Sequence, residues 1–219
     1  NVWVRFSMAK AMATGNPLFV LARQTLEALR AELATHHVQL EPGLAIQPGE
    51  GLLCYYHRGE RQIYLSAPDP AQPRGRFELL IFQHLMQFRS ACAVLELLEQ
   101  ITPWLVAHEV GHHLRRQMGL WGEDAGREEQ IASELATAFV KSRLSDEQRQ
   151  ALLTSLAAGL SGLGQGLAYE QTRRDAPSLI RHVYEHMRQF HAQLESDDPH
   201  TIAAFVHTHL LCASGNPCA

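Results

Sequence analysis

A single pair of short β-strands is the only β-pattern in this 219-residue chain, so most of the fold has to be helical. Residues 52–56 and 62–66 are aromatic or β-branched runs, and Gly59 lies in the connection between them, which predicts a hairpin. In the rest of the chain, apolar residues recur at helical spacing. We therefore predict an α+β fold that is predominantly α. The expected helices cover residues 17–35, 75–99, 103–118, 127–143, 146–158, 176–194 and 199–212.

Capping residues, prolines and glycines set the predicted boundaries of these elements. Thr102 followed by Pro103 predicts a helix start, because threonine caps helix N-termini and proline is tolerated in the first turn. The helix before it is apolar on most sides and is expected to be central and buried. Ser145 and Gln148 form a capping box for the helix that begins at residue 146. Glycines and prolines are expected to make a loop of residues 40–51 and to end the capped helix at Gly159, Gly162, Gly164 and Gly166.

Histidine is the outlier of the composition, with 13 residues against 5 tyrosines and 3 tryptophans. This excess is typical either of metal chemistry or of a polar helix surface. The 19 lysines and arginines and 23 acidic residues give a formal charge of −4, which argues against a strongly electrostatic nucleic-acid binder. No signal peptide is predicted in residues 1–20, and the most apolar stretch, 77–98, is too polar to face lipid. We expect a cytoplasmic protein with no membrane partner.

The four cysteines give no sign of a thiolate zinc site, because no two of them have C-x-x-C spacing. Cys54 and Cys92 stand among apolar residues and are expected to be small buried side chains. Cys212 and Cys218 lie near the end of the sequence and are expected to be unbridged in a reducing compartment.

The segment with the clearest chemistry reads His-Glu-Val-Gly-His at residues 108–112, the pattern H-E-x-x-H. Residues four apart on an α-helix differ by only about 40° in direction and by about 6 Å in height. His108 and His112 can therefore bind one Zn²⁺ together. Glu109 would lie beside the metal and act as general base toward a water that the metal holds.

A third ligand has to come from elsewhere in the chain. Arg115 and Met118 occupy the positions at which one family of zinc proteases has glycine and a third histidine, and Asp124 lacks the Gly-Thr context of a second family. The helix predicted after the motif carries three carboxylates near its start. From the residues alone, each of them is a candidate: Glu128, Glu129 and Glu134.

Residues 108–114, followed by Glu129, Ala132, Ser133 and Ala136, resemble the gluzincin metallopeptidases. The compact members, the ImmA/IrrE-type peptidases and minigluzincins, have H-E-x-G-H and then E-x-x-A-[N/D]-x-F-A on the next helix. The resemblance covers about 32 residues, 108–139. It implies that His108, His112 and Glu129 bind one Zn²⁺ and that Glu109 is the catalytic base. Ser133 replaces the usual Asn or Asp, which helps to orient a ligand histidine.

The same resemblance implies the architecture and the activity. A zincin-like catalytic core would span residues 1–145, and a helical subdomain, 146–219, would complete the cleft. An edge strand, either 52–56 or 63–66, would pair with an extended peptide. The expected activity is that of a zinc metalloendopeptidase on a protein or peptide substrate. Cys54 could add a sulfur ligand as an inhibitory switch, although simple packing is the stronger expectation.

Other polar side chains are weaker candidates. His182, Glu185 and His186 outline the inverted zinc motif H-x-x-E-H, but their helix is so polar that a solvated face is expected instead. A histidine of this pair, or Tyr184, could alternatively stabilise the oxyanion of the tetrahedral intermediate. His113 is expected at the rim of the cleft or behind the ligands.

Two other functions are compatible with these patterns. One is a zincin-like binding or regulatory domain with little activity. The other is a helical interaction module in which the motif is accidental.

Overall fold

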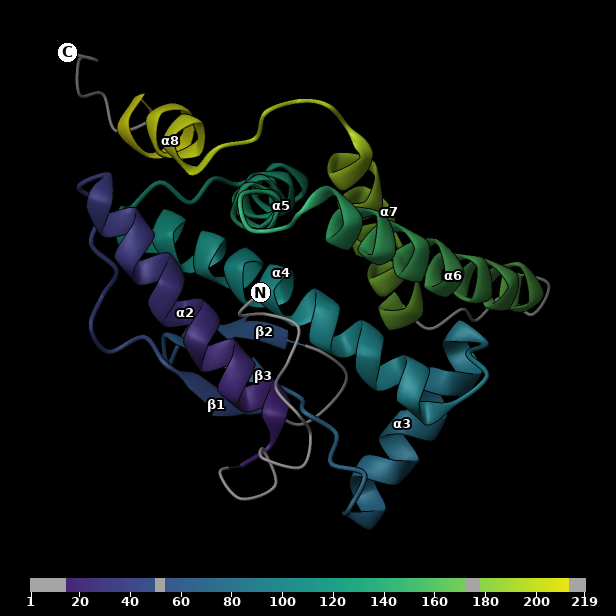
Figure 1. The fold of residues 1–219 in the computed structure, drawn as a ribbon. Coiled ribbons are helices and arrows are strands. Elements are labelled where there is room, and N and C mark those ends of the chain that lie inside the picture. Colours follow the sequence, from purple (N-terminus) through teal and green to yellow (C-terminus); the bar gives the residue numbers. More distant parts are fainter. Residues whose placement is uncertain (1–14, 50–53, 172–177, 213–219) are drawn as a thin grey trace.

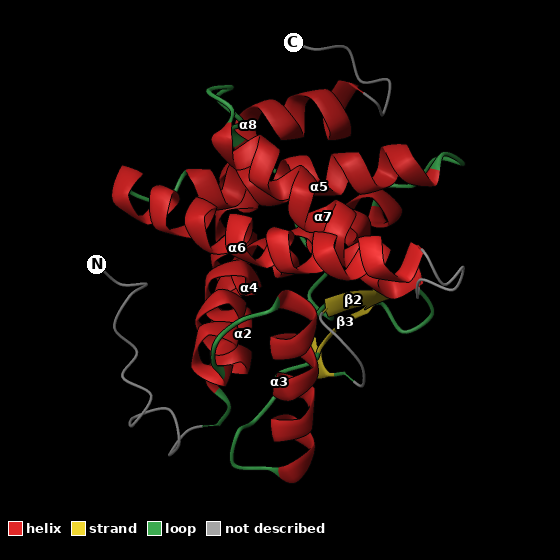
Figure 2. Ribbon diagram, turned by 90° about the vertical axis from the view of Figure 1, so that its right-hand side faces the viewer, coloured by secondary structure: helices red, strands yellow, loops and turns green. Residues whose placement is uncertain are grey.

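The computed structural model of the chain describes residues 15–49, 54–171 and 178–212, and Figures 1 and 2 show the fold from two sides. Helices dominate, and three short strands form one sheet, as predicted for a mainly helical α+β protein. The elements are α2 (Pro17–Thr35), β1 (Ile46–Pro48), β2 (Cys54–His57), β3 (Gln62–Leu65), α3 (Pro73–Met86), α4 (Ala91–Gln117), α5 (Ala125–Lys141), α6 (Asp146–Gln171), α7 (Ser178–Glu195), α8 (Ile202–Phe205) and a π-helical turn, η1 (Val206–Leu211).

The sheet has the strand order β1-β3-β2 and confirms the predicted hairpin. β2 pairs antiparallel with β3, with Tyr55 opposite Tyr64, and Ile63 and Leu65 of β3 point into the core. β3 is therefore the central strand and β2 an edge strand, so 63–66 is not the edge. The prediction of an unbroken loop over 40–51 was wrong, because Ile46–Pro48 pairs in parallel with β3. A strand of three residues that ends in proline is too short to show an alternation of apolar and polar residues in the sequence.

The predicted boundary between the helices at 75–99 and 103–118 was also wrong. α3 ends at Met86 and is followed by Gln87, which has a positive φ of 53°; α4 begins after Ser90, whose side chain accepts from the Ala93 amide. α4 then runs through Pro103 without a break. Thr102 does not cap a helix, and its hydroxyl donates to the Leu98 carbonyl one turn earlier. Proline removes one helical hydrogen bond, and the packing of α4 against its neighbours holds the helix together across this position.

The glycines of α6 do not end that helix, contrary to expectation. The capping box forms as predicted, with reciprocal hydrogen bonds between Ser145 and Gln148 of 3.0 and 3.2 Å, but α6 continues to Gln171. A Cβ atom at Gly162 would lie 2.0 Å from the carbonyl oxygen of Met86. This glycine therefore lets the end of α3 pack directly on the backbone of α6.

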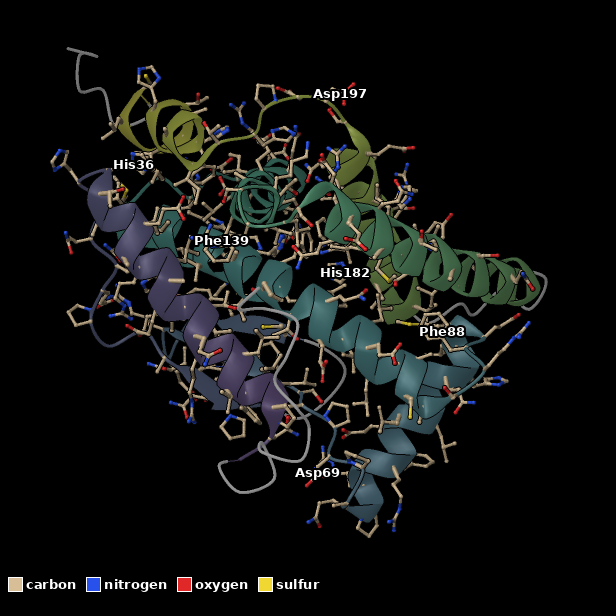
Figure 3. All side chains as sticks on the ribbon, in the orientation of Figure 1. His36, Asp69, Phe88, Phe139, His182 and Asp197 are labelled. Atoms are coloured by element: carbon tan, nitrogen blue, oxygen red, sulfur yellow. The ribbon has the colours of Figure 1, made fainter. Side chains whose placement is uncertain are left out.

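One hydrophobic core runs from Leu18 in α2 to Leu210 near the end of the described chain, and α4 lies at its centre. α2 and the sheet pack on one part of α4, and α3, α5 and α6 pack on the rest (Figure 1). α7 packs on α5 and α6 and reaches α4 where the Phe190 ring stacks on Trp104. Phe139 lies inside this core, whereas Asp197 lies at the surface (Figure 3). Helices after residue 145 share the same core, and the proposed division at that residue stays a prediction.

The remaining expectations concern the cysteines and a membrane-spanning helix. Cys92 was expected to be buried and is exposed, because it stands in the first turn of α4 on the solvent side. Cys218 lies outside the described residues, so the expectation for Cys212 and Cys218 stays open. None of the described helices is both long enough and apolar enough to cross a bilayer.

Candidate active site

The close crossing of α4 and α5 builds the site. A Cβ atom at Gly111 would lie 2.8 Å from the Cα of Ala132, so only glycine allows the two helices to approach so closely at this point. Gly111 belongs to the H-E-x-x-H segment, and Ala132 lies one turn after Glu129. The start of α5 is set by Asp124, whose side chain accepts from the Arg127 amide. The crossing thus brings Glu129 against both histidines of α4.

His108, His112 and Glu129 form a group that can hold a metal ion. The Nε2 atoms of the two histidines lie 3.1 Å apart. Oε2 of Glu129 lies 3.1 Å from Nε2 of His108, and Oε1 of Glu129 lies 3.4 Å from Nε2 of His112. In a tetrahedral site with bonds of about 2.0–2.1 Å, two ligand atoms are about 3.3–3.4 Å apart. The separations between the ligand groups are close to this value, and one ligand atom from each residue lies within 4.8 Å of the other two.

The electrostatics of the group suit a cation. Burial lowers the pKa of His108 to about 4, so its imidazole is neutral near pH 7 and has a lone pair to offer a metal. For Glu129, burial would raise the pKa, but hydrogen bonds from His108 and His112 outweigh it and hold the pKa far below its usual range. Two imidazoles and one ionised carboxylate are a common donor set of catalytic zinc sites.

Ser133 lies where the resemblance implies a residue that orients a ligand. Its buried hydroxyl is 3.3 Å from Nδ1 of His108, the ring nitrogen turned away from the metal group. The Trp104 ring also packs on His108, with centroids 5.1 Å apart. Among the described residues, Nδ1 of His112 is buried without a hydrogen-bond partner. Ser133 and Trp104 therefore hold the His108 ring, whereas Nδ1 of His112 has no such partner among the described residues.

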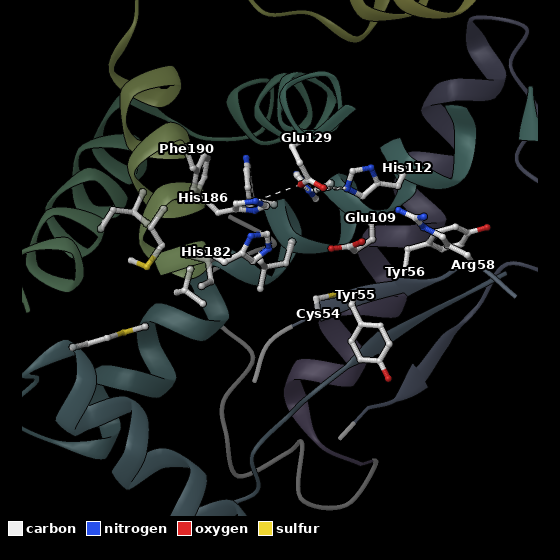
Figure 4. A pocket seen from close by; sticks show the side chains of 18 of the residues that line it. Cys54, Tyr55, Tyr56, Arg58, Glu109, His112, Glu129, His182, His186 and Phe190 are labelled. Carbon is white, nitrogen blue, oxygen red and sulfur yellow. Dashed lines mark hydrogen bonds and ion pairs between the residues drawn. The ribbon is translucent and has the colours of Figure 1, made fainter. Parts of the chain in front are cut away.

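Glu109 lines the cavity beside the metal group and is only 9% exposed. Burial raises its pKa to about 7, although the nearby His112 charge and a backbone hydrogen bond from Tyr56 act in the other direction. A carboxylate with a pKa near the working pH can both accept and return a proton. Figure 4 shows Glu109 next to His112 and facing β2.

The other two carboxylates of α5 do not join the group. Glu128, 2% exposed, accepts two hydrogen bonds from Arg115 and one from the Gly122 amide. Glu134 accepts from His209 at 2.7 Å. Of the three candidates, the structure brings only Glu129 to His108 and His112.

His182 and His186 differ from the expected solvated helix face. Both line the cavity, and the half-buried His186 lies 3.3 Å from the Glu129 carboxylate (Figure 4). His182 remains exposed at the cavity surface, with its ring centroid 4.0 Å from that of His186. Glu185 pairs with Arg188 on the outside of α7, so no second metal group forms among the described residues. Burial lowers the pKa of His186 to about 4.

A signal for His186 was present in the sequence. Val183, Met187, Phe190 and Leu194 are all buried and recur at helical spacing, so α7 has an inward stripe despite its many charges. His186 adjoins that stripe. Tyr184 does not line the cavity; it packs beside Gly164 of α6, which removes it as an oxyanion donor.

The edge strand β2 forms the wall opposite α5. Cys54, Tyr55 and Tyr56 line the cavity, and the outer side of β2 pairs with no other strand among the described residues. His113 lies behind this wall, buried, with Nδ1 3.1 Å from the Tyr56 hydroxyl. Cys54 lines the cavity without belonging to the metal group, and burial raises the pKa of its thiol.

The cavity has a volume of about 350 Å³ and is lined by β2 and by α3 to α7. Sequence reasoning missed the apolar lining and also Arg58, Trp104 and Trp121. Trp104 stands one helical turn before His108, which was a usable signal, whereas Arg58 and Trp121 lie in loops without a local pattern.

No known protein family, curated protein or solved structure matches this chain. The resemblance to gluzincins therefore rests on the residues of α4 and α5 named above.

Proposed function

We propose that this protein is a zinc-dependent metallopeptidase that hydrolyses peptide bonds in a protein or peptide substrate. The observation that carries the proposal is the convergence of His108, His112 and Glu129 on one point of an open cavity, with Glu109 beside it. The edge strand β2 along the same cavity supports an extended peptide as the substrate, because its outer side pairs with no other strand among the described residues and can accept one.

The residues divide the chemistry between them. A bound Zn²⁺ would polarise the scissile carbonyl and lower the pKa of the attacking water. Glu109 takes a proton from that water and delivers it to the leaving amine nitrogen. Ser133 keeps the His108 ring in the orientation that ligation needs. His186, neutral near pH 7, has a ring N–H to offer the carbonyl oxygen as negative charge develops there.

The decisive experiment compares wild type with Glu109→Gln, which keeps the size of the side chain and removes its basicity. Purified wild type should contain about one equivalent of zinc and cleave an unstructured protein substrate such as casein. Glu109→Gln should contain the same zinc and lose at least about a hundredfold in cleavage rate. Equal cleavage by both proteins would refute the mechanism.

The metal content separates the alternatives. Zinc without cleavage in either protein would favour a binding or regulatory domain. Protein that takes up no zinc would indicate that the motif is accidental.

A further inference from the structure

Two arginines surround the indole ring of Trp121 at one end of the cavity. The guanidinium carbon of Arg116, from the end of α4, lies 4.1 Å from the ring centroid, and that of Arg58, from the hairpin turn, lies 5.0 Å from it. The Trp121 ring in turn lies 5.4 Å from the ring of His112. This arginine–tryptophan cluster (Arg58, Arg116 and Trp121) therefore adjoins the metal group directly.

The two arginines of the cluster differ from the neighbouring Arg115 in their charge partners. Among the residues that the structure describes, no carboxylate forms an ion pair with Arg58 or Arg116. The neighbouring Arg115, in contrast, donates two hydrogen bonds to Glu128. The Nε of Arg116 is buried without a hydrogen-bond partner. Burial and the charge of Arg58 both lower the pKa of Arg116. Two guanidinium groups held together without a counter-charge, in a chain of net charge −4, favour an external anion.

The opposite end of the cavity has a different character. Met86, Ile101, Leu156 and Met187 line it together with Phe190, and they carry no charge. Figure 4 shows the two ends, with Arg58 and Tyr56 on one side of Glu109 and His186 and Phe190 on the other. A ligand that crosses the metal group would thus meet the Arg58 guanidinium and the Trp121 ring, with Arg116 on that ring, at one end and apolar side chains at the other.

We infer that the arginine–tryptophan cluster binds a carboxylate of the substrate, which makes acidic peptides the preferred substrate class. The carboxylate belongs either to an Asp or Glu side chain or to the C-terminus of the peptide. Guanidinium groups match carboxylates in geometry, and a charge-assisted pair is about twice as strong as a neutral hydrogen bond. This inference rests on the proposed peptidase function, but its test measures binding and not cleavage.

The test uses the zinc-loaded Glu109→Gln protein, immobilised and exposed to a synthetic library of randomised octapeptides. Captured peptides are identified by mass spectrometry. We expect acidic peptides to be enriched about tenfold over their Asn and Gln counterparts. The double substitution Arg58→Gln/Arg116→Gln in the same background should abolish the enrichment. Arg23→Gln, at an exposed position of α2 away from the cavity, makes a comparable charge change and should leave the enrichment intact.

Captured peptides are then synthesised with Glu or Gln and with a free or amidated C-terminus, so that the two sources of the carboxylate are separated. Circular dichroism and thermal unfolding check that the double variant remains folded. Equal capture of acidic and amide peptides, no capture of either, or unchanged enrichment in the folded double variant would overturn the inference. If wild type cleaves peptides without a preference for acidic ones, the proposed function stands and the inference is rejected. If acidic peptides are enriched but wild type cleaves none, the inference stands and the proposed function is rejected.

Discussion

At the scale of single residues, neighbouring carboxylates of one helix have different roles. Glu129 faces the histidines of α4, whereas Glu128, one residue earlier, faces Arg115. A helix turns by about 100° between consecutive residues, so a shift of one position moves a carboxylate from one neighbour to another. Each of the two should therefore respond differently to the same substitution.

Glu129→Gln should lose most of its zinc affinity while the metal-free protein stays folded, because its carboxylate is a proposed ligand. Glu128→Gln should destabilise the fold by about 3–5 kcal/mol, because it leaves the buried Arg115 charge uncompensated. Competition with a chromogenic chelator measures the first effect, and urea unfolding of metal-free protein measures the second. Glu134→Gln is the matched control for zinc affinity, and a loss as large as that of Glu129→Gln would contradict the assignment.

Glu109 makes the metal-free protein sensitive to pH. Its pKa is raised from 4.5 to about 7, so folding takes up a proton between these values. The stability cost is absent below pH 4.5, grows as the pH rises and is complete above about pH 7. In the presence of a chelator, Glu109→Gln should therefore be more stable than wild type at pH 8, by about 3 kcal/mol.

The same substitution should have little effect on the stability of metal-free protein at pH 5. Urea unfolding at the two pH values provides the comparison. A stability gain that is equal at both, or larger at pH 5, would show that burial of the Glu109 charge is not its cause.

At the scale of elements, two glycines inside helices are contact points, and one of them, Gly162, was expected to break its helix. Gly111 allows α4 and α5 to cross, and Gly162 allows α3 to meet α6. Sequence patterns predict a break because glycine is a poor helix former, but they carry no information about which distant backbone lies opposite. For the same reason the predicted start at Thr102 failed, since Ser90 and Gln87 hold the actual boundary.

Gly162→Ala and Gly166→Ala are a matched pair for this interpretation. Gly162→Ala should lower the free energy of unfolding by about 1–3 kcal/mol, because its Cβ would collide with the Met86 carbonyl. Gly166 has no atom within 4 Å of its added Cβ, so Gly166→Ala should raise stability by about 0.5–1 kcal/mol through helix propensity. Equal effects in chemical unfolding would argue against the contact.

At the scale of the whole molecule, the cavity joins segments that are far apart in the chain. β2, the C-terminal half of α4, the start of α5 and the middle of α7 all line the cavity that contains the metal group. A metal held between α4 and α5 therefore stabilises the packing of the core and not a single helix.

Zinc removal should lower the melting temperature of wild type. With free zinc at about a hundred times its Kd, the linkage contributes about 2.7 kcal/mol, or roughly 5–10 °C for a chain of this size. Differential scanning fluorimetry with and without EDTA measures the shift. Glu129→Gln should show a much smaller one, and an unchanged wild-type melting temperature would contradict the proposed metal site.

The sequence by itself determined the helical character of the fold, the hairpin, and the placement of His108, Glu109 and His112 on one helix. These features depend on local periodicity, which can be recognised in a short stretch of sequence. Only the tertiary structure decided among Glu128, Glu129 and Glu134. Only it brought His186, Arg58 and Trp121 to the cavity. Such choices depend on where helices cross and on which loop packs beside them, and these contacts join residues that no short stretch of sequence contains together.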